Sequence, residues 1–433
     1  MNFQSWNIME ERKKTVAAIT VGCRLNQADT ALIYGRLREA GYEILKPETA
    51  EPLDLIIINS CAVTAAASQK SRQYARSCRK KHPEAKIIAT GCDSETEKIY
   101  WMQEKAADIY IPNSEKSKIL DYINGITPTE KPAVKNIFRE NAVSVYPFRS
   151  RAFIKIQEGC ESFCTYCIVP YARGPERSRD RNEVISEFRK LIELGHHEIV
   201  LTGVNISTYR DGSCRLSDLL SELSAIDGDF RIRLSSTEPH TENRKLIGVM
   251  KDNPKICRFL HLPLQHGTNE ILKLMGRKYS SEEFADFANE ALSSIPGLHL
   301  GTDVICGFPG ETEERFDKSC RFIENIPFAN LHVFCFSQRK GTPAADFPDT
   351  VSGEVMKYRH RFLEDIEDKL ADKFLDSQIG KTLRVLIEKV RSNGGCEGWT
   401  DNYIRVQTNI GNAKANSFAD VLIKKKSGKI LEG

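Results

Sequence analysis

Three cysteines stand close together in the segment EGCESFCTYCIVPYARG: Cys160, Cys164 and Cys167. Their C-x3-C-x2-C spacing does not fit a structural zinc site, because such a site needs four protein ligands and no fourth ligand stands nearby. Three thiolates on one loop can instead hold three irons of a cubane cluster and leave the fourth iron without a protein ligand. A cofactor or substrate can bind directly to such an open iron.

A second set of cysteines, Cys23, Cys61 and Cys92, is dispersed along the first hundred residues. Each follows an apolar, strand-like run, in the segments VGC, NSC and TGC. The carboxyl ends of parallel strands share the edge of the sheet where ligands bind. We therefore expect the three thiols to converge, either as a second site with three ligands or as unrelated cysteines at strand ends.

The composition indicates a cytoplasmic protein of several domains. A chain of 433 residues exceeds one ordinary core, and its 40% hydrophobic and 28% charged residues are typical of a globular protein. No run approaches the roughly 20 apolar residues that span a membrane, and no secretory signal opens the chain. Seven cysteines show no ligand spacing and are expected to be buried or incidental: Cys78, Cys214, Cys257, Cys306, Cys320, Cys335 and Cys396.

The pattern of elements predicts an α/β protein with three parts. Residues 15–125 alternate strand-like and helix-like runs and indicate a doubly wound parallel domain. Residues 126–150, with Pro128, Pro132 and Pro147, are expected to be a linker. Residues 151–376 contain six strand–helix units, which favour an open (β/α)6 partial barrel over a closed one of eight units. Residues 377–433 are strand-like with intervening turns and favour a small antiparallel β-barrel.

These motifs, in this order, resemble those of the radical S-adenosylmethionine methylthiotransferase family. The resemblance rests on VGCRLNQADT, NSCAVT and TGCDSE, on C-x3-C-x2-C with Tyr166 before its last cysteine, and on a terminal barrel similar to a TRAM domain. It implies two [4Fe–4S] clusters, one on each cysteine set, with S-adenosylmethionine bound at the Cys160 set. Two departures touch no thiolate: Arg24 where lysine is common, and DSE after Cys92.

The resemblance also implies a substrate. RIRLSSTEP (231–239) is similar to the branch that converts N6-threonylcarbamoyladenosine next to the tRNA anticodon into its 2-methylthio derivative. The alternatives are the same reaction on isopentenyladenosine in tRNA or on a ribosomal-protein aspartate, and a non-catalytic iron–sulfur sensor that binds RNA. The implied partners are tRNA, an external electron donor such as flavodoxin or ferredoxin, and a sulfur donor that the sequence does not identify.

Polar residues at barrel strand ends are candidates for cofactor binding. Glu238 matches in place a family residue that contacts the cofactor, and Asn205, Gln265 and Asp303 are further candidates or ordinary loop and cap residues. His261 and His266 are expected to serve packing or hydrogen bonding.

Basic and aromatic residues suggest where RNA could bind. From residue 379 the tail carries ten Lys and Arg against five Asp and Glu, including Lys424, Lys425, Lys426 and Lys429. Trp399 and Tyr403 could stack on unpaired bases or belong to the core. The stretch 173–181 could contact the cofactor or tRNA phosphates, or form salt bridges.

Overall fold

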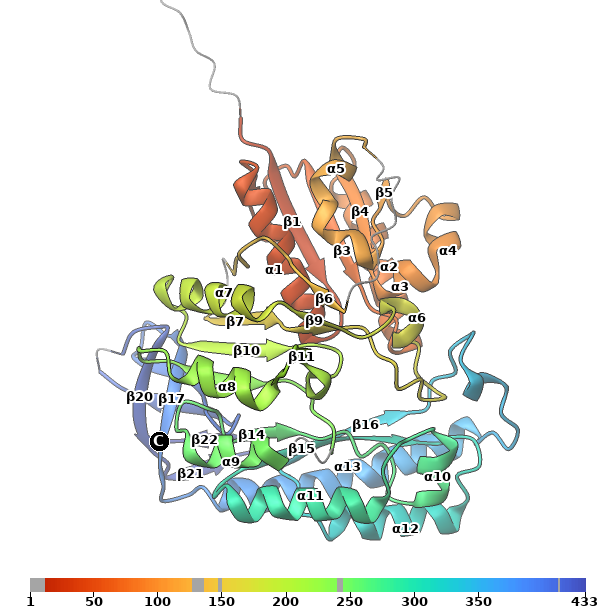
Figure 1. The fold of residues 1–433 in the computed structure, drawn as a ribbon, viewed down its shortest axis with the longest axis vertical. Coiled ribbons are helices and arrows are strands. Elements are labelled where there is room, and N and C mark those ends of the chain that lie inside the picture. Colours follow the sequence, from red (N-terminus) through yellow and green to blue (C-terminus); the bar gives the residue numbers. More distant parts are fainter. Residues whose placement is uncertain (1–11, 127–135, 147–149, 240–243, 412) are drawn as a thin grey trace, which may run out of the picture.

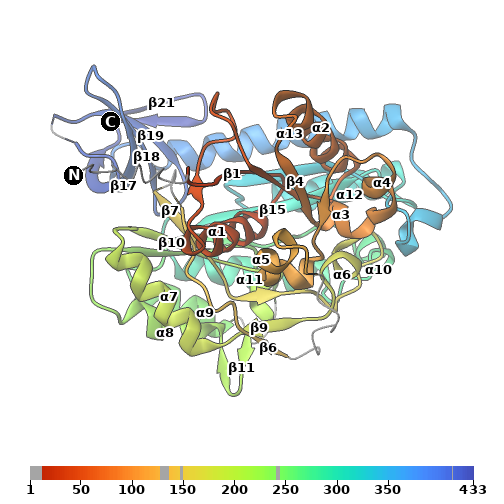
Figure 2. The same ribbon diagram turned by 90° about the horizontal axis from the view of Figure 1, so that it is seen from above.

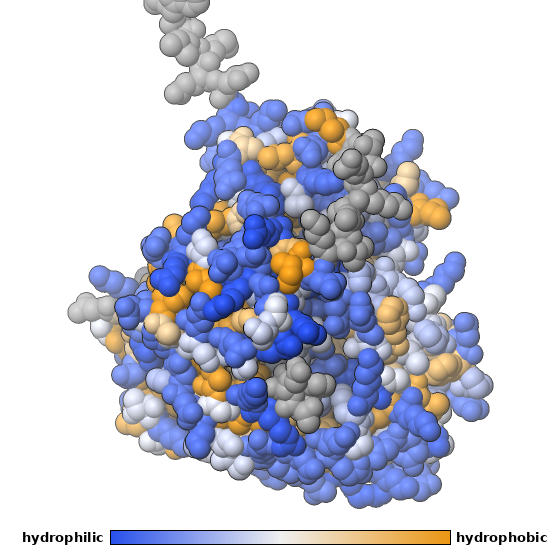
Figure 3. Space-filling view, viewed as in Figure 1, coloured by the Kyte–Doolittle hydropathy of each residue, from blue (hydrophilic) through white to orange (hydrophobic). Residues whose placement is uncertain are grey.

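The computed structural model describes residues 12–126, 136–146, 150–239, 244–411 and 413–433 (Figure 1). The three prolines of the expected linker lie outside these residues. The part of that segment that is described contains a short strand, β6 (Ile137–Phe138), which pairs with β9 (Arg177–Arg179). Among the described residues, no helix combines the length and apolarity needed to cross a membrane. The face shown in Figure 3 is mostly hydrophilic, with scattered hydrophobic side chains.

The N-terminal sheet is parallel, with strand order β2-β1-β3-β4-β5. Its strands are β1 (Thr15–Thr20), β2 (Glu43–Ile44), β3 (Leu55–Ser60), β4 (Lys86–Gly91) and β5 (Ile109–Tyr110). The middles of the central strands are apolar because helices cover both faces of the sheet. The chain adds β2 on one side of β1 and then β3 on the other side, so the strand order reverses between β1 and β3. Ligands of open α/β sheets bind at such a switch point.

Alternate residues of these strands point to opposite faces of the sheet and pack into two hydrophobic clusters, one on each face. Ile57 packs with Ile33 and Leu37 of α1, whereas Ile56 packs with Ala75 of α2 and Trp101 of α4. The doubly wound domain expected from the sequence is confirmed. The elements that cover the sheet are α1 (Arg24–Glu39), α2 (Ala65–Lys81), α3 (Cys92–Thr96), α4 (Lys98–Gln103), η1 (Asn113–Lys118) and α5 (Ile119–Ile123).

The central part contains six parallel strands in two sheets of three, β13-β10-β7 and β14-β15-β16. The bridges Ile232↔Ile256 and Ser236↔His261 join the two sheets. The strands are β7 (Arg151–Lys155), β10 (Glu198–Thr202), β13 (Arg231–Leu234), β14 (Phe259–His261), β15 (His299–Cys306) and β16 (Asn330–Cys335). The predicted open partial barrel is confirmed.

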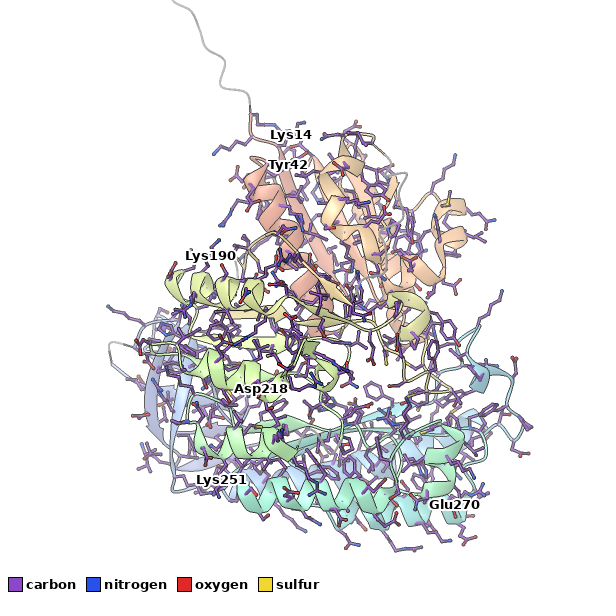
Figure 4. All side chains as sticks on the ribbon, in the orientation of Figure 1. Lys14, Tyr42, Lys190, Asp218, Lys251 and Glu270 are labelled. Atoms are coloured by element: carbon purple, nitrogen blue, oxygen red, sulfur yellow. The ribbon has the colours of Figure 1, made fainter. Side chains whose placement is uncertain are left out.

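Helices with one apolar face cover these strands and form with them the largest hydrophobic core. Helix α13 packs on β16 and places Leu363, Ile366 and Leu370 in that core, so it belongs to the barrel. The helices are α6 (Val169–Arg173), α7 (Arg181–Glu193), α8 (Leu216–Ser224), α9 (Arg244–Asp252), α10 (Asn269–Leu274), α11 (Ser281–Ser294), α12 (Glu313–Glu324) and α13 (Gly353–Asp376). Side chains from both sheets project into the space between them (Figure 4). The short remaining elements are β8 (Gln157–Glu158), η2 (Ile206–Thr208), β11 (Arg210–Asp211), β12 (Cys214–Arg215) and η4 (Pro343–Asp346).

The C-terminal part is a six-stranded sheet in the order β20-β17-β18-β19-β22-β21. All its pairs are antiparallel except β19 with β22, and the pairings of the described residues do not close it into a barrel. The predicted small antiparallel domain is confirmed, but its described strands form an open sheet and not a closed barrel. Its strands are β17 (Thr382–Val390), β18 (Gly395–Thr400), β19 (Arg405–Asn409), β20 (Ser417–Leu422), β21 (Lys425–Ser427) and β22 (Ile430–Glu432).

The N-terminal part sits on the barrel through α1, which lies against β7 (Figure 2). Asp29 of α1 is fully buried there. Its carboxylate accepts from Lys116 at 2.7 Å, from Lys155 of β7 at 2.9 Å and from Arg173 of α6 at 3.2 Å. Burial alone would raise the pKa of Asp29, but these three cations hold it well below its usual range. Since isolated buried charges are costly, the four residues stabilise one another.

Replacing Asp29 with Asn should lower the free energy of unfolding by about 3–5 kcal/mol, because the cations around it lose their shared buried counter-charge. Urea unfolding followed by circular dichroism measures the change. Asp286→Asn, on the exposed side of α11, is the matched control and should change stability by less than about 0.5 kcal/mol. Equal effects of the two substitutions would contradict the role given to Asp29.

Candidate active site

The dispersed cysteines meet at the carboxyl edge of the N-terminal sheet, at its switch point. Cys23 precedes α1, Cys61 follows β3 and Cys92 begins α3. Burial raises the pKa of Cys61 to about 12, and the charges of Cys92 and Cys23 act in the same direction. The sulfurs of Cys23 and Cys92 therefore both lie within electrostatic reach of the Cys61 sulfur. Such thiols give up their protons when a metal binds.

Glycines before Cys23 and Cys92 allow this approach. Gly22 has φ +99°, and a Cβ atom there would lie 2.7 Å from the Cys61 Sγ. Gly91 has φ +96°, and a Cβ atom there would lie 2.4 Å from the Ser60 backbone N. The VGC and TGC motifs thus each need a residue without a side chain before the cysteine.

The clustered cysteines occupy the loop between β8 and α6, beyond the carboxyl end of β7. The Cys167 N–H donates to the Cys164 carbonyl at 2.9 Å, and the Cys160 N–H donates to the Gly174 carbonyl at 3.1 Å. Burial raises the pKa of Cys167 to about 12, with further effects from Cys164 and Cys160. All thirteen cysteines of the chain are free thiols. The donor set fits a cluster with three thiolate ligands and one open iron.

Arg277 connects this loop to Glu238. Its Nη1 donates to the Cys164 Sγ at 3.3 Å, and its Nη2 donates to the Glu238 Oε1 at 2.8 Å. The backbone N–H of Glu238 donates to the Ser207 hydroxyl at 2.8 Å. Arg277 thus positions both the predicted cofactor-binding carboxylate and one of the predicted cluster ligands.

The other predicted cofactor-binding residues differ in their surroundings, and their cofactor role stays a prediction. Asn205 caps η2, because its Oδ1 accepts from the Ser207 N–H at 3.1 Å. Gln265 has φ +68° and pairs with Val304 through its backbone. Asp303 on β15 accepts from His261 at 3.0 Å and from His332 at 3.2 Å.

The triad of His261, Asp303 and His332 could also hold a metal ion, since its ligand atoms lie within 4.8 Å of one another. Burial opposes ionisation, but hydrogen bonds from both imidazoles hold the pKa of Asp303 below its usual range. Hydrogen bonding thus accounts for the triad, as expected for His261. His266 was likewise expected to make hydrogen bonds, and its Nε2 lies 3.3 Å from the Glu311 Oε1.

A cavity of about 1020 Å³ joins the three parts of the chain. Cys23 and Cys61 line it from the N-terminal domain, and residues of β14, β15 and β16 line it from the barrel. Trp399 and Tyr403 line it from the C-terminal domain, where they stack on each other with centroids 4.7 Å apart. The volume is that of a pocket for a sizeable ligand.

Most of the basic residues singled out in the sequence pair with carboxylates. Arg173 and Arg177 both pair with Glu158, and Arg179 pairs with Glu183. The salt-bridge alternative for the stretch 173–181 therefore describes these side chains. In the tail, Lys425 pairs with Glu432, Lys426 with Asp372 and Asp376, and Lys429 with Glu367 and Asp368. The tail charge is accordingly partly neutralised.

Sequence reasoning assigned no role to Asn26, Asp29 or Arg277. Asn26 donates to the carbonyls of Val21 and Ser60 and accepts from Arg173, so it ties two cysteine-bearing strand ends together. Asn26 and Asp29 were detectable as polar residues three apart on an otherwise apolar helix face. No spacing signal marks Arg277.

Comparisons with known proteins agree with this arrangement. A model described as "Radical SAM superfamily" matches residues 154–323, and one described as "Uncharacterized protein family UPF0004" matches residues 15–112. The radical S-adenosylmethionine methyltransferase TsrM from Kitasatospora setae has a similar fold, with a TM-score of 0.59 and 15% identity, over 77% of this chain and 75% of that one.

Relatives that are similar over nearly the whole chain show which family within this superfamily the protein belongs to. Threonylcarbamoyladenosine tRNA methylthiotransferase MtaB of Bacillus subtilis is 39% identical over 90% of both chains, and MtaB of Chlamydia pneumoniae is 36% identical over 88% of both. tRNA-2-methylthio-N(6)-dimethylallyladenosine synthase of Thermodesulfovibrio yellowstonii is 34% identical, over 96% of this chain and 97% of that one. The chain belongs to the radical S-adenosylmethionine methylthiotransferase family. It is a transferase whose cofactors include S-adenosylmethionine and a [4Fe–4S] cluster.

Arg277→Gln should lower the reductive cleavage of S-adenosylmethionine about 10- to 100-fold, because residues that orient metal ligands typically contribute that much. The readout is 5′-deoxyadenosine released by anaerobically prepared, dithionite-reduced protein. Arg321→Gln, on the exposed face of α12, is the control and should leave release unchanged. Undiminished release from the Arg277 variant would refute the positioning role.

Proposed function

We propose that the protein converts N6-threonylcarbamoyladenosine, next to the tRNA anticodon, into 2-methylthio-N6-threonylcarbamoyladenosine. The observation that carries the proposal is the cavity that Cys23 and Cys61 share with the barrel strands and the C-terminal domain. A base placed in it would meet Cys23 and Cys61 on one side and the barrel strands β14, β15 and β16 on the other. The relatives named MtaB, 33–39% identical over most of the chain, support the threonylcarbamoyl substrate.

In this proposal each cysteine set holds one [4Fe–4S] cluster with a vacant iron. Cys160, Cys164 and Cys167 would hold the cluster that binds S-adenosylmethionine, with Glu238 beside it. Cys23, Cys61 and Cys92 would hold the second cluster. When bound, the clusters would supply an electron for cleavage of S-adenosylmethionine and a sulfur atom for the product, and a second S-adenosylmethionine would supply the methyl group.

The protein's own residues position and enclose these groups. Arg277 would orient Cys164 and Glu238, and Arg173 would balance thiolate charge, since Cys92 and Cys23 lie close enough to raise its pKa against the effect of burial. The C-terminal domain would cover the cavity and bind tRNA phosphates. The remaining partners are an external electron donor, such as flavodoxin or ferredoxin, and a sulfur donor.

The test is nucleoside mass spectrometry of tRNA from a deletion strain that carries the wild-type gene, Cys61→Ala or Cys78→Ala. Wild type should restore 2-methylthio-N6-threonylcarbamoyladenosine, and Cys61→Ala should abolish it because the second cluster loses a ligand. Cys78→Ala is the matched control: Cys78 is also buried, but it lies on α2 and does not line the cavity. It should restore the product.

Unchanged product in the deletion strain would refute the proposed substrate. Loss of the methylthio group from dimethylallyladenosine instead would assign the protein to the other tRNA branch. A modified ribosomal-protein aspartate that disappears on deletion, with tRNA unchanged, would move the reaction to a protein substrate.

A further inference from the structure

One cation that lines the central cavity has no carboxylate partner among the described residues. Lys and Arg line the cavity at Arg24, Arg405 and Lys429. Arg405 pairs with Glu397, and Lys429 pairs with Glu367. Arg24 makes no ion pair with any carboxylate among the residues that the structure describes. A charge withdrawn from water is costly without a partner of opposite sign, so this position favours an anionic ligand.

The surroundings of Arg24 strengthen this point. Its guanidinium lies 5.2 Å from the ring centroid of Tyr403 and 5.5 Å from that of Phe259. Arg151 and Arg233 approach the same Tyr403 ring, at 5.8 Å and 4.8 Å. Arg151 pairs with Glu388, and Arg233 shares Glu198 with Arg231. The arginines beside Tyr403 therefore carry more positive charge than these two carboxylates balance.

The carboxylates that line the cavity do not supply the missing partner. Asp303 accepts from His261 and His332, and Glu367 accepts from Lys429 and from Asn330. Within the cavity, Arg24 can therefore bind a ligand that brings a negative charge.

We propose that Arg24 binds the carboxylate of the threonyl group of N6-threonylcarbamoyladenosine, and so determines which modified adenosine the enzyme accepts. The inference rests on the proposed function. Arg24 directly follows Cys23, so a carboxylate held by its guanidinium keeps the attached base on the side of the cavity that bears Cys23 and Cys61. Arginine suits this role because its planar fork matches a carboxylate.

A tRNA phosphate is the other anion that could reach an arginine, and the two sources predict different results. A phosphate contact would strengthen the binding of every anticodon stem-loop equally. A contact with the threonyl carboxylate strengthens only the binding of RNA that carries that group. The aromatic walls, Tyr403 and Phe259, favour a planar ligand over a backbone phosphate.

The experiment measures binding by fluorescence anisotropy with the anaerobically prepared holoenzyme. The three probes are anticodon stem-loops with N6-threonylcarbamoyladenosine, with unmodified adenosine, and with the threonyl carboxylate converted to its amide. Wild type should prefer the first probe about 10- to 100-fold over the other two, the range expected for one charged hydrogen-bonding contact. The amide probe tests the contact without any change to the protein.

Arg24→Gln should bind all three probes with the affinity that wild type has for the unmodified one, and Arg24→Lys should keep part of the preference. Arg38→Gln, at the exposed end of the same helix, is the matched control and should bind like wild type. The iron content of each variant shows whether the neighbouring cysteines still bind their cluster.

An unchanged preference in Arg24→Gln, or wild-type affinity for the amide probe, would overturn the inference and leave the proposed function standing. An equal loss of affinity for all probes in Arg24→Gln would assign Arg24 to a phosphate and equally overturn it. Failure of wild type to prefer the threonylcarbamoyl probe, with no methylthio product formed from it, would instead count against the proposed function itself.

Discussion

A buried carboxylate, Asp29, fixes the two cysteine sets relative to each other. It lies on α1, which begins directly after Cys23, and it pairs with Lys155 and Arg173 on either side of the loop with the clustered cysteines. Charges removed from water are stable only in close pairs, so the helix and the barrel have little freedom to slide. Chemistry between two metal centres depends on such restraint, because small displacements of reacting groups cost large factors in rate.

The C-terminal domain is held by a second buried charge cluster. Glu198 of β10 pairs with Arg231 and Arg233 of β13, and these arginines also donate to the backbone carbonyls of Trp399, Thr400 and Asp401. The guanidinium groups thus serve the barrel and the C-terminal domain at once. This attachment brings Trp399 and Tyr403 to the cavity wall and leaves the cavity bounded by all three domains.

Much of this architecture could be predicted from the sequence, because long apolar runs and amphipathic helices determine it. The six strand–helix units expected within residues 151–376 appear as β7, β10, β13, β14, β15 and β16 with the helices that cover them. Strand β2 was missed, since two residues carry no periodic signal, yet it makes the strand order reverse beside Cys23. Convergence of Cys23, Cys61 and Cys92 was predictable only as a consequence of the parallel sheet.

Contacts between distant segments could not be predicted in the same way. RIRLSSTEP indicated a family branch, but not that its arginines would hold the C-terminal domain. Trp399 and Tyr403 were expected as stacking surfaces or core residues, and the structure places them against each other and beside arginines on the cavity wall. Such pairings depend on the tertiary arrangement, which leaves no local pattern in the chain.

The most direct test of two clusters in one chain is a count of iron and acid-labile sulfide in anaerobically reconstituted protein. The account predicts about eight irons per chain. Joint replacement of Cys23, Cys61 and Cys92 by Ala should leave about four, and so should joint replacement of Cys160, Cys164 and Cys167. About four irons in the wild-type protein, or about eight in either triple variant, would contradict it.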